Sequence, residues 1–170
     1  MASGARNAAA AGVASSPMAR ALQQLNPIET LIPPQLRGRM KDFFAYCGSV
    51  NPLPAGATVS DDIQIQADSD FLILAGIVGV RDAATGLAFQ ADAPITVSIL
   101  DTGSGRQLNN EATDLNNLFG TGREPAYWTM PKLIKRSSTI QTVLGNLDPG
   151  NGFIVRYSYV GIKVFPATAG

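Results

Sequence analysis

The chain has 170 residues and a formal net charge of zero, with 15% charged and 45% hydrophobic residues, which fits one folded domain and leaves little room for two complete cores. The lack of net charge excludes a global electrostatic attraction to nucleic acid, and the lack of any histidine excludes every Ser-His-Asp or Cys-His catalytic arrangement. Seventeen glycines and eleven prolines favour short elements joined by turns, and hence a β-rich class.

Charge is distributed unevenly along the chain. Residues 1–41 contain five basic residues and one acidic residue, a balance of +4, whereas residues 61–101 contain one basic and seven acidic residues, a balance of −6. Because regions of opposite charge attract each other, we expect the basic segment to be drawn to the acidic region of its own chain or of a neighbouring copy.

The first residues predict an arm and not part of a core. Residues 1–16 are rich in small side chains and contain too few large apolar groups to build a core. Ser16-Pro17 then supplies a helix N-cap and a proline at the first helical position, and Leu22 and Leu25 lie on one side of the short helix that follows. Asn26-Pro27 ends that helix. We therefore expect an extended arm that contains one short helix.

Beyond this helix, apolar residues alternate with prolines, which is typical of an extended strap that lies on another surface. We interpret residues 1–39 as a partner-binding arm and residues 40–170 as one β-sandwich domain. The expected partner contacts of the arm are one basic and five apolar residues: Arg20, Leu22, Leu25, Ile28, Leu31 and Ile32.

From about residue 40 onward, the pattern changes to short β segments separated by turn residues. Residues 63–67 alternate between apolar and polar, so Ile63 and Ile65 should face the core while the glutamines between and after them face outward. Residues 71–80 are apolar nearly throughout, which predicts a strand that is covered on both faces.

Two turns frame the next strand. Residues 82–86 predict a turn, residues 94–100 alternate as a strand, and residues 101–105 end that strand. Residues 107–131 hold asparagines, prolines and glycines among scattered apolar side chains, which predicts a long structured loop with one helical turn near Asp114–Leu118.

The last part of the chain predicts two more strands. Residues 138–144 and 153–160 are interpreted as an antiparallel pair joined by a turn at residues 148–151, and Gly161 as a bulge or bend. About six to eight strands without a repeat favour one all-β domain. The predicted class is a jelly-roll-like antiparallel β-sandwich with an N-terminal arm. Its strand order stays open, because sandwich, jelly roll and barrel share this local pattern.

The single cysteine, Cys47, excludes an intrachain disulfide and a cysteine-built metal site. Its apolar neighbours, residues 43–46, predict a buried small hydrophobe in place of a reactive thiol. No apolar run reaches the length of a signal-peptide core or of a membrane span of about 20 residues. We therefore expect a soluble protein that is made in the cytoplasm and has no membrane partner.

Pairs of acidic residues are the remaining candidates for catalysis or metal binding. Asp61 and Asp62 are adjacent and would point to opposite faces of a strand, while Asp68-Ser69-Asp70 lacks the further acids and the glycine of a calcium loop. Gly103-Ser104-Gly105-Arg106 lacks the lysine and helix of a phosphate-binding loop. No aromatic residue interleaves with the basic residues of the arm, so nucleic acid is not an expected partner. We predict a non-enzyme with no catalytic residue, metal, cofactor or small-molecule substrate.

Aromatic residues and methionine gather in the predicted long loop. These side chains are enriched at the cores of protein interfaces, so they predict a partner-contact patch, or alternatively a cap over the edge of the sandwich. They are Phe119, Tyr127, Trp128 and Met130.

Several stretches between Gln64 and Phe165 resemble small virion proteins of tailed bacteriophages. They are residues 67–71, residues 95–108, Met130-Pro131 leading to residues 138–140, and the ending at residues 157–165. These segments look like those of jelly-roll cement or decoration proteins that sit on phage capsids, whereas the first 40 residues match none of them. The resemblance implies a structural virion protein on the capsid surface. It would form a homodimer or homotrimer and stabilise the phage head by bridging major capsid protein subunits.

Two other functions fit the same residues. One is a different virion role, as a head-to-tail collar or tail structural protein. The other is a carbohydrate-binding β-sandwich adhesin, in which Tyr127 and Trp128 would stack on a sugar.

Overall fold

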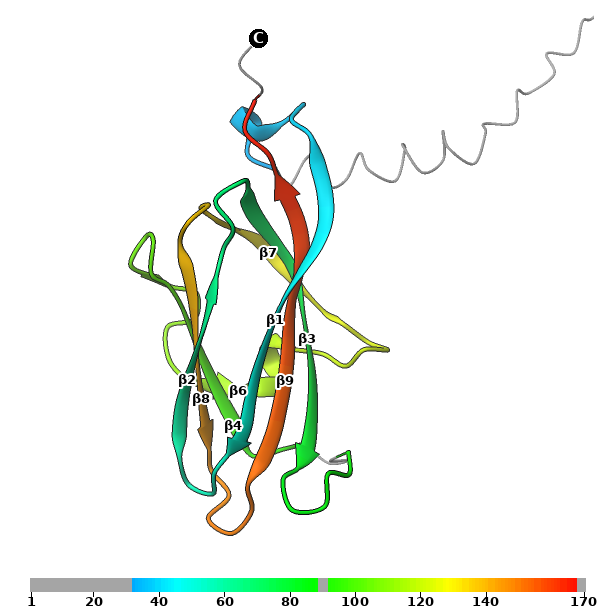
Figure 1. The fold of residues 1–170 in the computed structure, drawn as a ribbon, viewed down its shortest axis with the longest axis vertical. Helices are drawn as coiled ribbons and strands as arrows, with labels where there is room; N and C mark the ends of the chain where they lie inside the picture. Colours follow the sequence, from blue (N-terminus) through cyan, green and yellow to red (C-terminus); the bar gives the residue numbers. More distant parts are fainter. Residues whose placement is uncertain (1–31, 89–91, 168–170) are drawn as a thin grey trace, which may run out of the picture. The chain divides into compact units, whose positions relative to one another are not determined.

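The structure, a computed structural model, describes residues 32–88 and 92–167 of the chain (Figure 1). The chain divides into two compact units, residues 1–37 and 38–170. Residues 32–37 of the first unit are described, and they contain the 3-10 turn η1, Pro34–Leu36, in place of a fully extended strap. The predicted short helix and the arm residues Arg20, Leu22, Leu25, Ile28 and Leu31 lie outside the described residues.

The second unit consists of two antiparallel sheets. The four-stranded sheet has the order β1 (Lys41–Leu53), β9 (Phe153–Val164), β3 (Asp70–Asp82), β7 (Ala126–Ile134). The other sheet has the order β2 (Thr58–Gln64), β8 (Thr139–Asn146), β4 (Ile95–Asp101), β5 (Arg106–Gln107), and β6 (Thr113–Asp114) also pairs with β4. One short helix, α2 (Leu115–Leu118), follows β6. The all-β sandwich predicted from the sequence is confirmed.

The strand order is that of a jelly roll. The β1–β9 pair of one sheet is matched by the β2–β8 pair of the other, and β3 and β4 then flank β9 and β8 in the two sheets. Apart from β4, β5 and β6, which share one sheet, consecutive strands cross from sheet to sheet, so the chain winds around a single core (Figure 1). This settles the order that the local sequence pattern left open.

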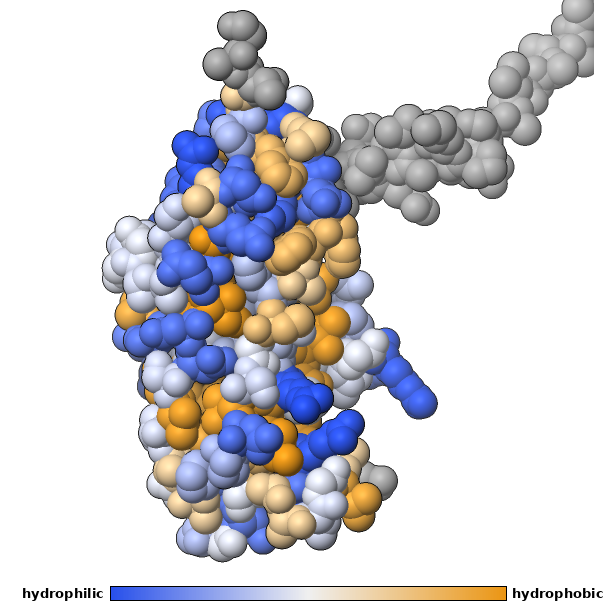
Figure 2. Space-filling view, viewed as in Figure 1, coloured by the Kyte–Doolittle hydropathy of each residue, from blue (hydrophilic) through white to orange (hydrophobic). Residues whose placement is uncertain are grey.

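Alternation along the strands explains which side chains form that core. Ile95, Val97 and Ile99 of β4 are at most 1% exposed, while the residues between them are partly exposed. Ile63 and Ile65 are also buried, and both neighbouring glutamines are exposed, as predicted. Over the face viewed in Figure 2, apolar and hydrophilic side chains are interspersed.

Two predictions about the final third of the chain are wrong. The strands β8 and β9 do not pair with each other, because β8 belongs to the five-stranded sheet and β9 to the four-stranded sheet. The turn between them carries the chain across the sandwich, and Asp148 stabilises it by accepting hydrogen bonds from the N–H groups of Gly150 and Asn151. The end of the predicted long loop, Ala126–Ile134, is strand β7, which pairs with β3. The predicted helical turn at its centre is α2.

The predicted irregularity at Gly161 is a bulge in the facing strand. The pairing of β3 with β9 passes from Ile73↔Gly161 directly to Ala75↔Val160, which leaves Leu74 without a partner. A Cβ atom on Gly161 would lie 2.0 Å from the Leu72 carbonyl oxygen. Glycine is required here because the backbone of β3 approaches so closely.

Candidate functional site

The predicted aromatic patch lies on β7, at the free edge of the four-stranded sheet. Residues 132–134 pair with β3, and so do Ala126 and Tyr127. The four residues between them, 128–131, leave the ladder opposite the bulge at Leu74. Pro131 lies in this interval and has no N–H group to donate to a neighbouring strand. The interruption therefore turns a stretch of β7 away from the sheet.

Trp128 is the residue of this stretch whose side chain packs inward, against the core. Its indole N–H donates a hydrogen bond to the Leu118 carbonyl oxygen at 3.0 Å. Its ring meets Tyr159 edge-to-face, with 6.2 Å between ring centroids. Because Tyr159 is 0% exposed, Trp128 is anchored directly on the core, and the backbone beside it is held rigidly.

Tyr127 and Met130 lie on the outside of the same stretch, with 76% and 73% of their surface exposed. They border a shallow depression whose remaining wall is largely apolar. It is lined by Ile99, Leu108, Asn117, Leu118, Tyr127, Trp128, Thr129, Met130 and Lys132. We call Tyr127, Trp128 and Met130 the β7 patch: two large exposed side chains over a half-buried tryptophan.

Phe119, the fourth predicted contact residue, is placed elsewhere. It is 1% exposed and packs against Tyr157 and Tyr159 at centroid distances of 5.7 and 5.5 Å. Next to it, Gly120 exchanges backbone hydrogen bonds with Gly76 and Val78 of β3, at the end of the β3–β7 pairing. Phe119 is therefore a core residue beneath the sandwich edge and is not available on the surface.

The arm residue Ile32 is 1% exposed. The backbone near it is fixed by Arg37, whose side chain donates a hydrogen bond to the Ile32 carbonyl oxygen at 3.1 Å. The other predicted arm contacts lie outside the described residues.

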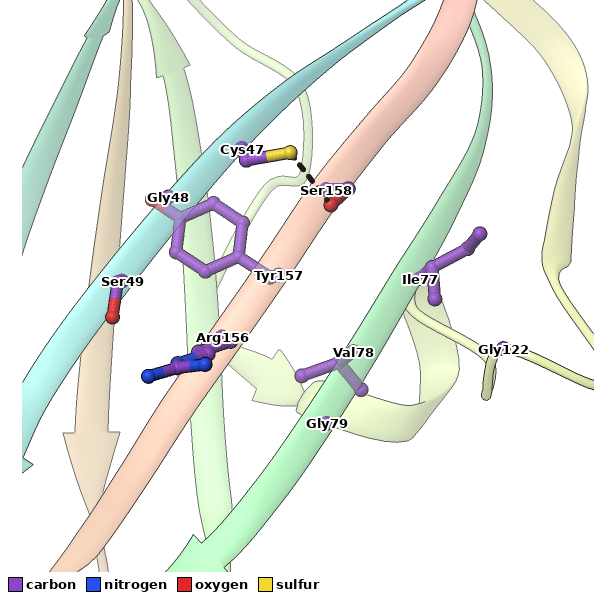
Figure 3. A pocket seen from close by; sticks show the side chains of 10 residues that line it. All are labelled: Cys47, Gly48, Ser49, Ile77, Val78, Gly79, Gly122, Arg156, Tyr157 and Ser158. Atoms are coloured by element: carbon purple, nitrogen blue, oxygen red, sulfur yellow. Dashed lines mark hydrogen bonds between the residues drawn. The ribbon is translucent and has the colours of Figure 1, made fainter.

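A second surface feature lies on the outer face of β1, β9 and β3 (Figure 3). It is a shallow groove lined mainly by small residues, including Cys47, Ser49, Gly79 and Ser158. Cys47 is exposed, and its sulfur accepts a hydrogen bond from the Ser158 hydroxyl at 3.2 Å. The prediction of a buried cysteine is wrong, because Tyr46 and Val50 are the residues of this stretch that face the core, which points Cys47 outward.

Asp61 and Asp70, which were candidates for catalysis or metal binding, form hydrogen bonds and an ion pair within the fold. Asp61 lies inside β2, where it accepts hydrogen bonds from the Ser49 backbone N–H at 3.0 Å and from the Tyr157 hydroxyl at 2.9 Å. Asp70 pairs with Lys135 at 3.3 Å. Each of these carboxylates thus links separate parts of the sandwich.

Asp68 joins a polar cluster at one end of the core. The ammonium group of Lys163, a residue that is 5% exposed, donates to Asp68 at 3.0 Å and also to Gln66, and it lies 4.6 Å from the centre of the Phe44 ring. The hydrogen bonds from Lys163 and then from Ser69 lower the pKa of Asp68 below its usual value. An ion pair and a cation–π contact therefore satisfy the charge of Lys163.

Within residues 32–88 and 92–167, no cluster of three or more acidic or cysteine side chains is arranged to hold a metal ion. None of the helices in that part of the chain has the length and apolar character needed to cross a membrane.

Comparison with known proteins gives a distant likeness among solved structures. No protein-family model matches the chain, and no curated protein matches it. Among solved structures it is similar to the crystal structure of the infectious bursal disease virus VP2 subviral particle, with 12% sequence identity and a TM-score of 0.37. The match covers 78% of this chain and 34% of that chain, so this chain spans about a third of its length.

Proposed function

We propose that this protein is a non-enzymatic structural protein of a virus particle. Specifically, it would be a cement or decoration protein on the capsid surface of a tailed bacteriophage, where it would bridge major capsid protein subunits. The resemblance of residues 95–108 and 157–165 to such proteins supports this role. The jelly-roll order of the strands agrees with the fold that the resemblance implies.

The observation that carries the proposal is the exposure of Tyr127 and Met130 on a rigid support. Large apolar side chains that are three-quarters exposed contribute nothing to folding, but they become favourable contacts when a partner covers them. Trp128 anchors the backbone between them to the core. Little conformational freedom is therefore lost on binding, which favours affinity.

In this proposal the arm supplies a second set of contacts. Residues 1–39 carry four basic residues and one acidic residue, a balance of +3, together with the apolar residues Leu22 and Leu25. A segment of this composition can bind along a neighbouring subunit, with its ordering offset by burial of apolar surface at about 25 cal/mol per Å².

The test is cosedimentation of the full chain with assembled shells of the major capsid protein from the same virus. Tyr127→Ala combined with Met130→Ala should weaken binding by at least about tenfold, as expected for central interface residues. Leu22→Asp combined with Leu25→Asp should also weaken it. The matched control is Leu147→Ala, which removes another exposed apolar side chain, 63% exposed, from a separate loop. Wild-type affinity in both double variants would contradict the proposal.

The adhesin alternative requires that the β7 patch bind a sugar instead of a protein. Stacking on a sugar needs an exposed ring face, and Trp128 is half-buried with its N–H group already bonded to Leu118. Tyr127 is the exposed ring of the pair. Glycan-array binding that is lost in Tyr127→Ala, without any binding to capsid shells, would favour that alternative over a capsid role.

A further inference from the structure

Strand β1 has one free edge. It pairs with β9 on one side, and it is the terminal strand in the order of its sheet (Figure 1). In an antiparallel strand the backbone N–H and C=O groups of successive residues point to alternate sides. The Ser49 N–H bonds to Asp61 of β2, not to β9. Phe43, Ala45 and Cys47 lie an even number of residues before Ser49, so their backbone N–H and C=O groups also point away from β9.

The hydrogen bonds of β3 give the same assignment independently. Val78 donates to Gly120, on the side away from β9, so the backbone groups of its neighbour Ile77 point toward Ser158 of β9. The backbone N–H and C=O groups of Ser158 therefore point toward β3 and away from β1. Cys47 of β1, which lies opposite Ser158, then directs its own backbone groups to the free edge. Within the described part of the chain, no backbone hydrogen bond satisfies Phe43, Ala45 or Cys47 at this edge.

Residues 43–47 of this edge lack the features that usually prevent strands from pairing. Natural edge strands are commonly interrupted by a bulge, a proline or an inward charge. The register of β1 is unbroken from Lys41 to Val50, with its first irregularity near Pro52. Residues 43–47 are uncharged, and the side chain of Phe43 is 69% exposed. Residues 43–47 therefore form an edge that is unbroken in register and uncharged.

We propose that this edge binds a second copy of the chain, through antiparallel pairing of the two β1 strands centred on Ala45. A twofold axis places each residue opposite its counterpart across the centre. Phe43 would then face Cys47 of the second copy, and Lys41 would face Ser49. Apolar side chains thus meet apolar ones and no like charges are opposed. The zero net charge adds little repulsion between copies.

The pairing would satisfy the free groups of Phe43, Ala45 and Cys47 in both copies, with about six new backbone hydrogen bonds. It would also join the two four-stranded sheets into one continuous sheet. The proposal gives a surface for the homo-oligomer that the resemblance to cement proteins implies, and in that respect it rests on the proposed function. The β1 pairing is tested without capsid protein, so a negative result would not contradict the capsid role. Likewise, a failure to bind capsid shells would not contradict the β1 pairing.

A disulfide trap tests the register directly. In the full chain carrying Cys47→Ser, the substitution Ala45→Cys places two thiols opposite each other, with Cα atoms about 5.5 Å apart, which is within disulfide reach. Mild oxidation should yield mostly covalent dimer. Wild-type Cys47 is the matched control: its two copies would be offset by four residues, about 13 Å along the strands, and should not cross-link. The variant Leu147→Cys with Cys47→Ser reports random collision and should also stay monomeric on denaturing gels.

Sedimentation equilibrium provides a second, disulfide-free measurement. The wild-type chain should be a dimer, and Phe43→Lys should be a monomer with an unchanged far-ultraviolet circular dichroism spectrum, because Phe43 is exposed. Leu147→Lys should remain a dimer. A monomeric wild-type chain, a dimer that persists in Phe43→Lys, or equal cross-linking of the Ala45→Cys and Leu147→Cys variants would overturn the proposal.

Discussion

Thr142 and Tyr159 place two hydroxyl groups deep inside the core. Both residues are 0% exposed, and their side-chain oxygens are 2.7 Å apart. Burial raises the pKa of the Tyr159 phenol, so this group stays protonated and neutral. One of the two hydroxyls donates a hydrogen bond to the other, which links β8 of one sheet to β9 of the facing sheet.

Removing one of the two hydroxyls should cost more than removing both. Thr142→Val leaves the Tyr159 hydroxyl buried without this partner, so we expect a loss of about 1–3 kcal/mol in the free energy of unfolding. Adding Tyr159→Phe removes the orphaned group and should recover part of that loss. Urea denaturation of the single variants and the double variant measures the coupling. Strictly additive losses would show that the two hydroxyls act independently.

Three surface carboxylates predict how stability responds to acid. Hydrogen bonds lower the pKa values of Asp68, Asp82 and Asp148 below 3.8; the largest contributions come from Lys163, the Thr85 backbone and the Asn151 side chain, respectively. A carboxylate with a lowered folded-state pKa stabilises the fold above its unfolded pKa, and this stabilisation is lost as the pH falls through the folded value.

The chain should therefore lose stability as the pH falls below about 3.8, the unfolded value. Asp82→Asn should flatten this part of the profile, since it removes one of the groups that take up a proton on unfolding. Thermal melts between pH 2 and 6 provide the measurement. An acid slope as steep in Asp82→Asn as in the wild-type chain would contradict the assignment.

At the scale of elements, two glycines on paired strands offer a matched comparison. A Cβ atom on Gly161 of β9 would lie 2.0 Å from a β3 carbonyl oxygen, whereas one on Gly79 of β3 would meet nothing within 4 Å. Gly161→Ala should lower the free energy of unfolding by at least about 2 kcal/mol, because backbone must shift to make room. Gly79→Ala should be neutral or gain up to about 1 kcal/mol. Equal effects in denaturant titrations would contradict the bulge geometry.

The positions of most strands follow from sequence, but their division between sheets does not. The alternation at Ile95–Leu100 marks a half-buried strand, and it would look the same in either sheet. Sequence proximity therefore suggested that β8 and β9 pair, while the fold sends them to opposite sheets. Strand β7 resembled a loop because Pro125 precedes it and Pro131 lies within it, and an edge strand tolerates such prolines.

The candidate site was predictable only in part for a related reason. Side chains of adjacent strand residues point to opposite faces, so one of Tyr127 and Trp128 had to face inward. The sequence did not show which. Around Cys47 both Phe43 and Phe44 are apolar, which leaves the phase of the alternation ambiguous, and the structure resolves it by burying Tyr46.

For the whole molecule, the low charge content and the jelly-roll order of the strands both favour contact with other proteins. A chain with 15% charged residues relies on uncharged surface, and its exposed large apolar side chains include Phe43 on one edge of the four-stranded sheet and Tyr127 and Met130 on the other. A scaffold of this kind presents edges for contact with other proteins. These edges agree with the proposed role, in which the protein would work by assembly, as a bound part of a capsid.

The most direct measurement of the proposed capsid role is quantitative mass spectrometry of purified phage particles assembled with this chain, compared with heads that lack tails. The account predicts that the chain is present at a fixed ratio to the major capsid protein in both preparations. Recovery of the chain with tails alone, or its absence from particles, would contradict it.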